Sequence, residues 1–151
     1  HQVTTIFNPA PAVEFPDSVY SLCDYFTPNE TEAADLAGVP VTNTEEAREA
    51  AKIFRDRGVK TALITLGEMG CYFMNESGEG HVPAFDMSGK VVETTGAGDG
   101  FNGGFAAALA EGKSPDEAIR YGSATAAISV TRLGTAPAMP QRREIEQLVN
   151  S

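Results

Sequence analysis

Hydrophobic residues recur along the chain with two spacings, one typical of strands and one typical of helices. Short apolar or β-branched runs bounded by turn-forming residues indicate strands, and apolar residues three and four positions apart indicate an amphipathic helix. The stretch 41–58 has the helical spacing, since one apolar stripe is formed by Ala47, Ala50, Ala51 and Phe54. Up to residue 70 the two patterns predict strands at 3–8, 24–29 and 60–67 and helices at 16–23, 29–38 and 41–58.

The rest of the chain is predicted to begin with a hairpin and to end with helices. The runs CYFMN (71–75) and HVPAF (81–85) look like two strands that the turn-forming ESGEG joins. Ser114, Pro115 and Glu117 form a capping box with proline at the first helical position, which predicts a helix start. We further expect a strand at 91–95, a glycine loop at 94–104 that opens a helix, and helices at 114–134 and 140–150.

This order of elements predicts an α/β fold of the Rossmann-like kind, with a mostly parallel sheet flanked by helices and a small β-hairpin. In such sheets ligands bind beyond the carboxyl ends of the strands. Polar or glycine-rich segments follow four of the predicted strands, so we expect them to meet at one edge. These segments are NPAPA (8–12), TPNETE (27–32), TLGEMG (65–70) and TTGAGD (94–99).

Composition narrows the class of protein. Hydrophobic residues make up 42% and charged residues 21% of the 151 residues, as in ordinary globular domains. The formal net charge of −10 speaks against binding to the phosphate backbone of a nucleic acid. No apolar run has the length of a membrane span, and Cys23 and Cys71 are too few for a disulfide framework or a cysteine-based metal set. We therefore expect a cytoplasmic protein without nucleic-acid or membrane partners.

The glycine loop carries the chemistry that the residues themselves suggest. It places one carboxylate, that of Asp99, among several glycines where a helix begins, and a helix start suits an anion. GDGFNG (98–103) matches the dinucleotide pattern, but no second strand follows, so we reject that interpretation. His81 and His1 are interpreted as structural or surface residues. Two roles remain open for Asp99: a helix cap, or a base that takes a hydroxyl proton beside a bound phosphate.

Four motifs in the same order resemble the ribokinase-like (PfkB) family of sugar and nucleoside kinases. The resemblance covers essentially the whole chain, 1–151, but only the carboxyl-terminal, nucleotide-binding part of the family's fold. It implies ATP-dependent phosphoryl transfer to the primary hydroxyl of a sugar, with ribose as the first expectation. The motifs are TPNETEA (27–33), ALITLGEMG (62–70), ETTGAGDGFNGGF (93–105) and ISVTRLGTAP (128–137).

The resemblance also implies roles for single residues. Asp99 would be the base, and Gly96, Ala97 and Gly98 would line the anion hole. Asn29 and Glu32 would position Mg²⁺ and the phosphates largely through water, although such a pair at the start of a helix is by itself typical of a cap. The further contacts implied with ATP come from Thr65, Gly67, Glu68, Gly70 and Gly98, with Ser123 at the adenine.

A site for a monovalent cation, K⁺, is implied as well. It would consist of Glu93, Thr95 and backbone carbonyl groups of Ser129, Arg132 and Gly134. The chain departs from the family here, because the usual residue at position 93 is Asp, and Ala138 stands where a serine is common.

The family's sugar pocket and lid come mostly from an amino-terminal part, and the chain, which starts with His1 in a β-rich run, contains no motif of that part. We therefore expect this fragment to bind nucleotide with little or no turnover, and the full-length protein to form a homodimer. The alternatives are a kinase of another sugar or nucleoside, such as fructose or ketodeoxygluconate, or a non-catalytic nucleotide-binding relative.

Overall fold

The computed structural model describes residues 3–151, so the expectation for His1 lies outside it. The chain divides into two compact units, a first that ends at Pro83 and a second at Ala84–Ser151. No helix within residues 3–151 is long and apolar enough to cross a membrane.

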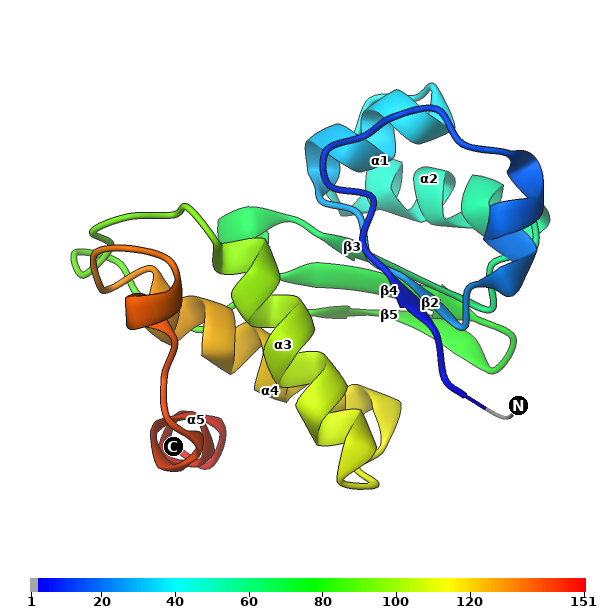
Figure 1. Ribbon diagram of the computed structural model, residues 1–151. Helices are drawn as coiled ribbons and strands as arrows, with labels where there is room; N and C mark the ends of the chain where they lie inside the picture. The colour runs from blue at the N-terminus through cyan, green and yellow to red at the C-terminus, as the bar shows by residue number, and fades with distance from the viewer. Residues whose placement is uncertain (1–2) are drawn as a thin grey trace. The chain divides into compact units, whose positions relative to one another are not determined.

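The first unit contains a mixed sheet in the order β1-β2-β3-β4-β5. The first three strands are parallel, and β4 and β5 are antiparallel to their neighbours in a hairpin (Figure 1). The open α/β sheet is the predicted fold class, although the strand expected at 3–8 is much shorter. The strands are β1 (Ile6–Phe7), β2 (Tyr25–Phe26), β3 (Thr61–Thr65), β4 (Cys71–Asn75) and β5 (Gly78–Val82).

Two α-helices cover one face of this sheet (Figure 1). Helix α2 packs on β3 and β4, and α1 packs on α2 and β3. Phe26, Phe54 and Ile64 lie completely buried between the layers. The helical segments are the 3₁₀ helix η1 (Asp17–Leu22), α1 (Glu30–Ala37), α2 (Thr44–Asp56) and the 3₁₀ helix η2 (Gly67–Met69).

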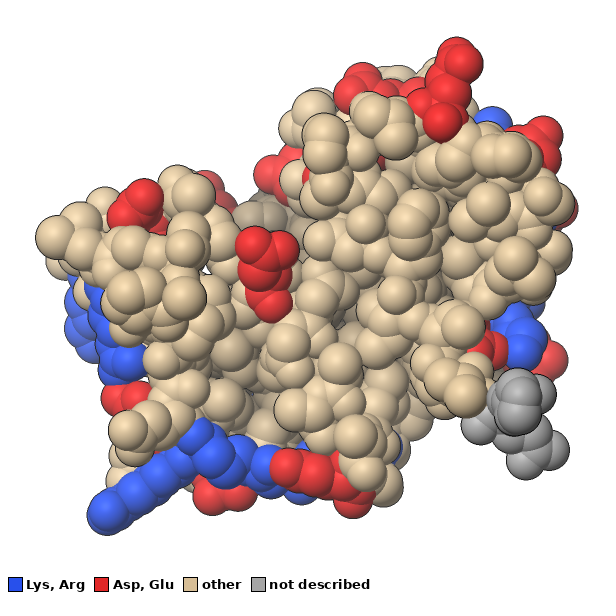
Figure 2. Space-filling model, viewed as in Figure 1, with Lys and Arg blue, Asp and Glu red and all other residues tan. Residues whose placement is uncertain are grey.

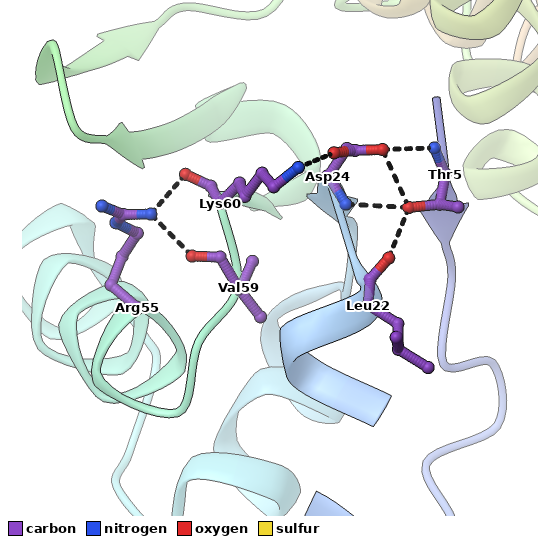
Figure 3. A network of polar contacts seen from close by, with 6 residues as sticks. All are labelled: Thr5, Leu22, Asp24, Arg55, Val59 and Lys60. Atoms are coloured by element: carbon purple, nitrogen blue, oxygen red, sulfur yellow. Dashed lines mark hydrogen bonds and ion pairs between the residues drawn. The ribbon is translucent and has the colours of Figure 1, made fainter. Parts of the chain in front are cut away.

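A network of polar contacts joins the amino ends of the three parallel strands (Figure 3). The Asp24 carboxylate, just before β2, accepts hydrogen bonds from the Thr5 N–H at 2.8 Å and from the Lys60 ammonium at 2.7 Å. The Thr5 hydroxyl donates to the Leu22 carbonyl oxygen at 2.6 Å, and Arg55 of α2 donates to the Lys60 carbonyl oxygen. Residues before β1, β2 and β3 are therefore tied together at the end opposite the expected ligand edge.

The hairpin is confirmed, but its second strand begins three residues earlier than predicted, at Gly78 and not at His81. The Asn75 side-chain oxygen accepts hydrogen bonds from the N–H groups of Ser77 and Gly78, at 2.8 and 3.0 Å. These bonds close a turn in which Asn75 pairs with Gly78. The two glycines of ESGEG therefore belong to the strand.

The second unit consists of helices and loops. Helices α3 and α4 pack along each other, and α5 packs on α4. The elements are α3 (Ala97–Ala110), α4 (Pro115–Ser129), the 3₁₀ helix η3 (Ala136–Ala138) and α5 (Arg142–Val149), which confirms the three predicted helices although α4 ends earlier.

The strand predicted at 91–95 is wrong, because no strand is present there. The N–H groups of Val92 and Glu93 both donate to the carbonyl oxygen of Val130, at 2.7 and 3.2 Å. Carbonyl groups at the end of a helix lack partners within the helix, so they offer acceptors to a passing segment. The glycine loop that follows therefore begins in the second unit and is not the continuation of a sheet strand.

Candidate functional site

The segments that follow β1, β2 and β3 start side by side at the carboxyl edge of these strands. The Thr27 N–H donates to the Phe7 carbonyl oxygen at 2.9 Å, and the Thr65 N–H donates to the Pro28 carbonyl oxygen at 3.0 Å. Thr65 also forms an isolated parallel bridge with Asn29. Three of the four predicted segments thus meet as expected, and the fourth, the glycine loop, lies in the other unit.

Asn29 and Glu32 form a reciprocal capping box at the start of α1. The Asn29 side-chain oxygen accepts from the Glu32 N–H at 2.8 Å, and Glu32 Oε2 accepts from the Asn29 N–H at 2.8 Å. Glu32 is only 8% exposed, whereas Asn29 lies at the surface. The pair is therefore held rigidly at the ligand edge, next to the start of the loop after β3.

The loop after β3 turns sharply through η2. Its backbone has positive φ at Gly67 (56°) and Gly70 (94°), which glycine adopts more readily than other residues. The Leu66 N–H donates to the Gly70 carbonyl oxygen at 2.8 Å and closes the loop at its base. Gly67 and Glu68 are exposed at its tip.

Sequence reasoning missed one contact of this loop. The His81 ring lies with Nε2 at 2.6 Å from the carbonyl oxygen of Met69. Nothing in the sequence indicates this partner of His81, because the contact depends on the register of the hairpin.

In the second unit, Asp99 is the third residue of α3, and it does not cap the helix. The helix begins after Gly96, which has a φ of 82° and no side-chain cap. The Ala97 N–H donates to the Thr94 carbonyl oxygen at 3.2 Å, whereas the N–H groups of Gly98 and Asp99 have no acceptor within residues 3–151. The exposed Asp99 carboxylate likewise has no hydrogen-bond or ion-pair partner in that part of the chain. Unpaired donors and an unpaired carboxylate thus stand side by side.

The loop before α3 contacts the loop after α4. Glu93 Oε2 accepts a hydrogen bond from the Gly134 N–H at 2.9 Å. A methyl group built on Gly96 would lie 3.2 Å from the Thr135 side chain, so the two loops touch closely there. The structure therefore brings two of the expected cation ligands, Glu93 and Gly134, together beside the start of α3.

The other expected ligands of the cation lie in or near the same loops. The Arg132 N–H donates to the carbonyl oxygen of Ser129 at 3.1 Å, and this carbonyl keeps a second lone pair. The Arg132 guanidinium pairs with Glu144 of α5, which fixes the loop from the other side. Thr95 is exposed.

Ser123, the expected adenine contact, is half-buried on α4. It follows Gly122, where an added methyl group would lie 2.8 Å from the Phe101 carbonyl oxygen of α3. Ser123 therefore lies on a helix that packs closely against α3 at the neighbouring residue, Gly122.

Basic side chains on the visible face gather over α5 (Figure 2), where Arg142 pairs with Glu111 and Glu146. Within the second unit, the start of α3 lies at the opposite end from α5 (Figure 1). The start of α3 therefore does not lie beside the basic side chains of α5. Within residues 3–151, no three His, Cys, Asp or Glu side chains form a cluster that could hold a metal ion by themselves.

Comparison with known proteins agrees with this geometry. The model of the pfkB family carbohydrate kinases matches residues 1–142. The chain is 46% identical over 142 residues to the ribokinase of Haemophilus influenzae, which covers 94% of this chain and 46% of that relative.

Solved structures agree with the sequence comparison. The ribokinase of Thermotoga maritima superposes with a TM-score of 0.90 at 39% identity, over 100% of this chain and 50% of its own. The ribokinase of Arabidopsis thaliana complexed with ribose and ATP superposes with a TM-score of 0.91 at 32% identity, over 99% and 48%. The chain thus spans about half the length of these relatives. On the family match, the sequence identity and the shared fold, this chain belongs to the pfkB family of carbohydrate kinases.

Proposed function

We propose that this chain is the carboxyl-terminal, nucleotide-binding part of an ATP-dependent kinase that phosphorylates the primary hydroxyl of a sugar, with ribose the first candidate. The observation that carries the proposal is the unpartnered carboxylate of Asp99 beside the free N–H groups of Gly98 and Asp99. The similarity to two ribokinases, one of them complexed with ribose and ATP, supports ribose as the substrate.

In this proposal Asp99 accepts the proton of the sugar hydroxyl while that oxygen forms a bond to the terminal phosphorus of ATP. The bond from this phosphorus to its bridging oxygen breaks, and ADP is the leaving group. The N–H groups at the start of α3, where Gly96, Ala97 and Gly98 form the turn, stabilise the charge on the transferring phosphoryl group. The positive end of the helix dipole acts in the same direction. Ala97 would have to release its bond to Thr94 to donate directly, so Gly98 is the stronger donor.

In the first unit, the residues expected to contact the nucleotide lie at the ligand edge. Asn29 and Glu32 are rigid because of their capping box, which suits residues that orient the waters around a Mg²⁺ bound mainly by phosphates. Thr65, Gly67, Glu68 and Gly70 would run along the nucleotide, and Ser123 would lie near the adenine.

The loops of the second unit contain the oxygen ligands that a K⁺ site would use. Glu93 uses Oε2 to hold the Gly134 N–H, and its Oε1 has no hydrogen-bond partner within the described residues. That oxygen, Thr95 and the carbonyl groups of Ser129, Arg132 and Gly134 supply the several oxygen ligands that a hard cation takes. A cation there would lie beside the anion site and help to neutralise it.

The sugar pocket and its lid would come from an amino-terminal part, so this chain alone should bind nucleotide with little or no turnover. The complete enzyme would be a cytoplasmic homodimer. Calorimetric titration of this chain with Mg·ADP, in potassium and then in sodium buffer, tests the nucleotide site, and NADH serves as the control ligand. Binding of NADH in place of ADP would overturn the proposal.

The role of Asp99 is tested by Asp99→Asn in the full-length enzyme with ribose and ATP. We expect kcat to fall by about 10²- to 10⁴-fold, the usual contribution of general-base catalysis, with little change in the affinity for Mg·ATP. Asp116→Asn is the matched control, because Asp116 is also an exposed acid in the first turn of a helix, α4. Near-normal turnover in Asp99→Asn would rule out the base assignment.

A further inference from the structure

We propose that His81 is a positioning residue of the nucleotide site: it holds the carbonyl group of Met69 and thereby fixes the loop Gly67–Gly70. This inference rests on the proposed function, because that loop is the one expected along the nucleotide. The contact itself, His81 Nε2 to the Met69 carbonyl oxygen at 2.6 Å, is independent of it.

The loop closes mainly on itself, which makes the bond from outside important. The Met69 N–H donates to the Leu66 carbonyl oxygen and the Gly70 N–H donates to the Gly67 carbonyl oxygen, each at 3.1 Å. Within residues 3–151, the bond from His81 is the only hydrogen bond that ties residues 67–69 to a side chain elsewhere. Beyond its own backbone bonds, the tip of the loop is therefore held by His81.

The bond acts on the peptide group between Met69 and Gly70. The Met69 carbonyl and the Gly70 N–H belong to one planar peptide unit, so fixing one fixes the other. The Gly70 N–H is held within the loop by the Gly67 carbonyl oxygen, but Gly70, which has a φ of 94° and lacks a Cβ, has many alternative backbone conformations. By holding the Met69 carbonyl from outside the loop, His81 adds a second restraint on this peptide group and reinforces the direction of the Gly70 N–H.

The hairpin gives His81 a rigid base. His81 lies opposite Tyr72 in the β4–β5 pairing, and Glu79 lies two residues before it on the same face. The Tyr72 hydroxyl donates to Glu79 Oε2 at 2.8 Å, and Arg48 of α2 pairs with Glu79 Oε1 at 2.8 Å. Burial, reinforced by this carboxylate, raises the pKa of Tyr72 to about 12, so the phenol remains a donor. β5 is thus anchored to β4 and α2 directly before His81.

The chemistry of the bond predicts which substitutions of His81 keep the hydrogen-bond donor and which remove it. A carbonyl oxygen only accepts, so the His81 ring must carry a proton on Nε2. In His81→Gln the side-chain amide nitrogen can stand near the position of Nε2 and donate the same bond. In His81→Asn the amide nitrogen ends nearer the ring's Nδ1 position and cannot reach Met69. His81→Leu removes the donor altogether.

The first measurement uses this chain, with Mg·ADP titrations and hydrogen exchange of the amides of residues 67–70. Loss of one hydrogen bond from a neutral donor should weaken ADP binding about threefold to tenfold in His81→Asn and His81→Leu. Exchange at Gly70 should become faster in both, and His81→Gln should restore both readouts. Thermal unfolding of each variant shows that the chain remains folded.

In the full-length enzyme the same variants should raise the KM for ATP with little change in kcat, because the loop meets the nucleotide and not the reacting atoms. Equal ADP affinity in the wild type, His81→Asn and His81→Leu would refute the positioning role while leaving the proposed function intact. Absence of ADP binding by the folded wild-type chain would instead overturn the proposed function together with this inference.

Discussion

Two adjacent glycines of α3 should respond in opposite directions to the same substitution. A methyl group at Gly104 would lie 2.2 Å from the Thr125 hydroxyl oxygen and 3.0 Å from the Tyr121 carbonyl oxygen, both on α4. At Gly103, apart from the neighbouring residues and the nearby backbone of α3 itself, no atom of residues 3–151 lies within 4 Å of the position that a methyl group would take. Gly103→Ala is therefore a matched control for Gly104→Ala in the same helix.

The magnitudes follow from the two environments. Replacing Gly by Ala in an exposed helix interior stabilises by about 0.5–1 kcal/mol, so Gly103→Ala should raise the free energy of unfolding by that amount. Gly104→Ala gains the same amount from the higher helix propensity of alanine, but overpacking lowers the free energy of unfolding by about 1–3 kcal/mol. It also displaces the buried Thr125 hydroxyl from its 2.8 Å bond to the Tyr121 carbonyl oxygen, which costs about 1 kcal/mol more. The net loss for Gly104→Ala is about 1–3 kcal/mol.

Urea unfolding followed by circular dichroism measures both variants against the wild type. A change in the midpoint with an unchanged m-value reports stability. The double variant Gly104→Ala/Thr125→Ala should recover part of the loss, because it removes the nearest clashing atom. If Gly104→Ala proves as stable as Gly103→Ala, the close packing of α3 on α4 is wrong.

Two further predictions concern stability. The bonds from Thr5 and Lys60 lower the pKa of the Asp24 carboxyl, so its stabilisation is present above its unfolded pKa and disappears as the pH falls through the lower folded pKa. Asp24→Asn should lower the free energy of unfolding by about 1–2 kcal/mol at pH 7. In urea titrations near pH 3 the difference between this variant and the wild type should be smaller. An equal difference at both pH values would contradict this account. Ser114→Ala removes the oxygen that caps α4 and should lower the free energy of unfolding by about 1 kcal/mol. The unfolding midpoint should therefore fall. An unchanged midpoint would mean that Glu117 alone holds the helix start.

The sequence predicted best the elements whose signals are local. The capping box of Ser114 and Glu117 is formed as predicted, and the helix predicted at 29–38 ends at Gly38, which has a φ of 72°. The apolar stripe of α2 is buried, including Phe54. In each case the residues that determine the structure lie within one or two turns of one another, so their spacing is sufficient.

Prediction failed where the deciding partner lies far along the chain. Val92 and Glu93 look like strand residues, but their N–H groups bond to Val130 at the end of α4. The contact of His81 with Met69 likewise depends on a register that the turn at Asn75 sets. β-propensity reports only that a segment suits an extended backbone, and it does not say which acceptor the segment will meet.

The glycines of the loop and of α3 fall into two groups: some lie at close packing contacts, and Gly98 does not. Methyl groups at Gly96, Gly100 and Gly104 would lie within 3.3 Å of Thr135, Met139 and Thr125, so one face of this segment needs glycine for close contact. Gly98 differs, because it has no positive φ and, apart from the neighbouring residues and the nearby backbone of α3, no atom of residues 3–151 within 4 Å of its methyl position. Packing therefore does not require glycine there, yet Gly98 directly precedes Asp99 and carries one of the two unpaired N–H groups. Close approach of a ligand to the backbone is one physical reason for a glycine at this position, and it agrees with the proposed anion site.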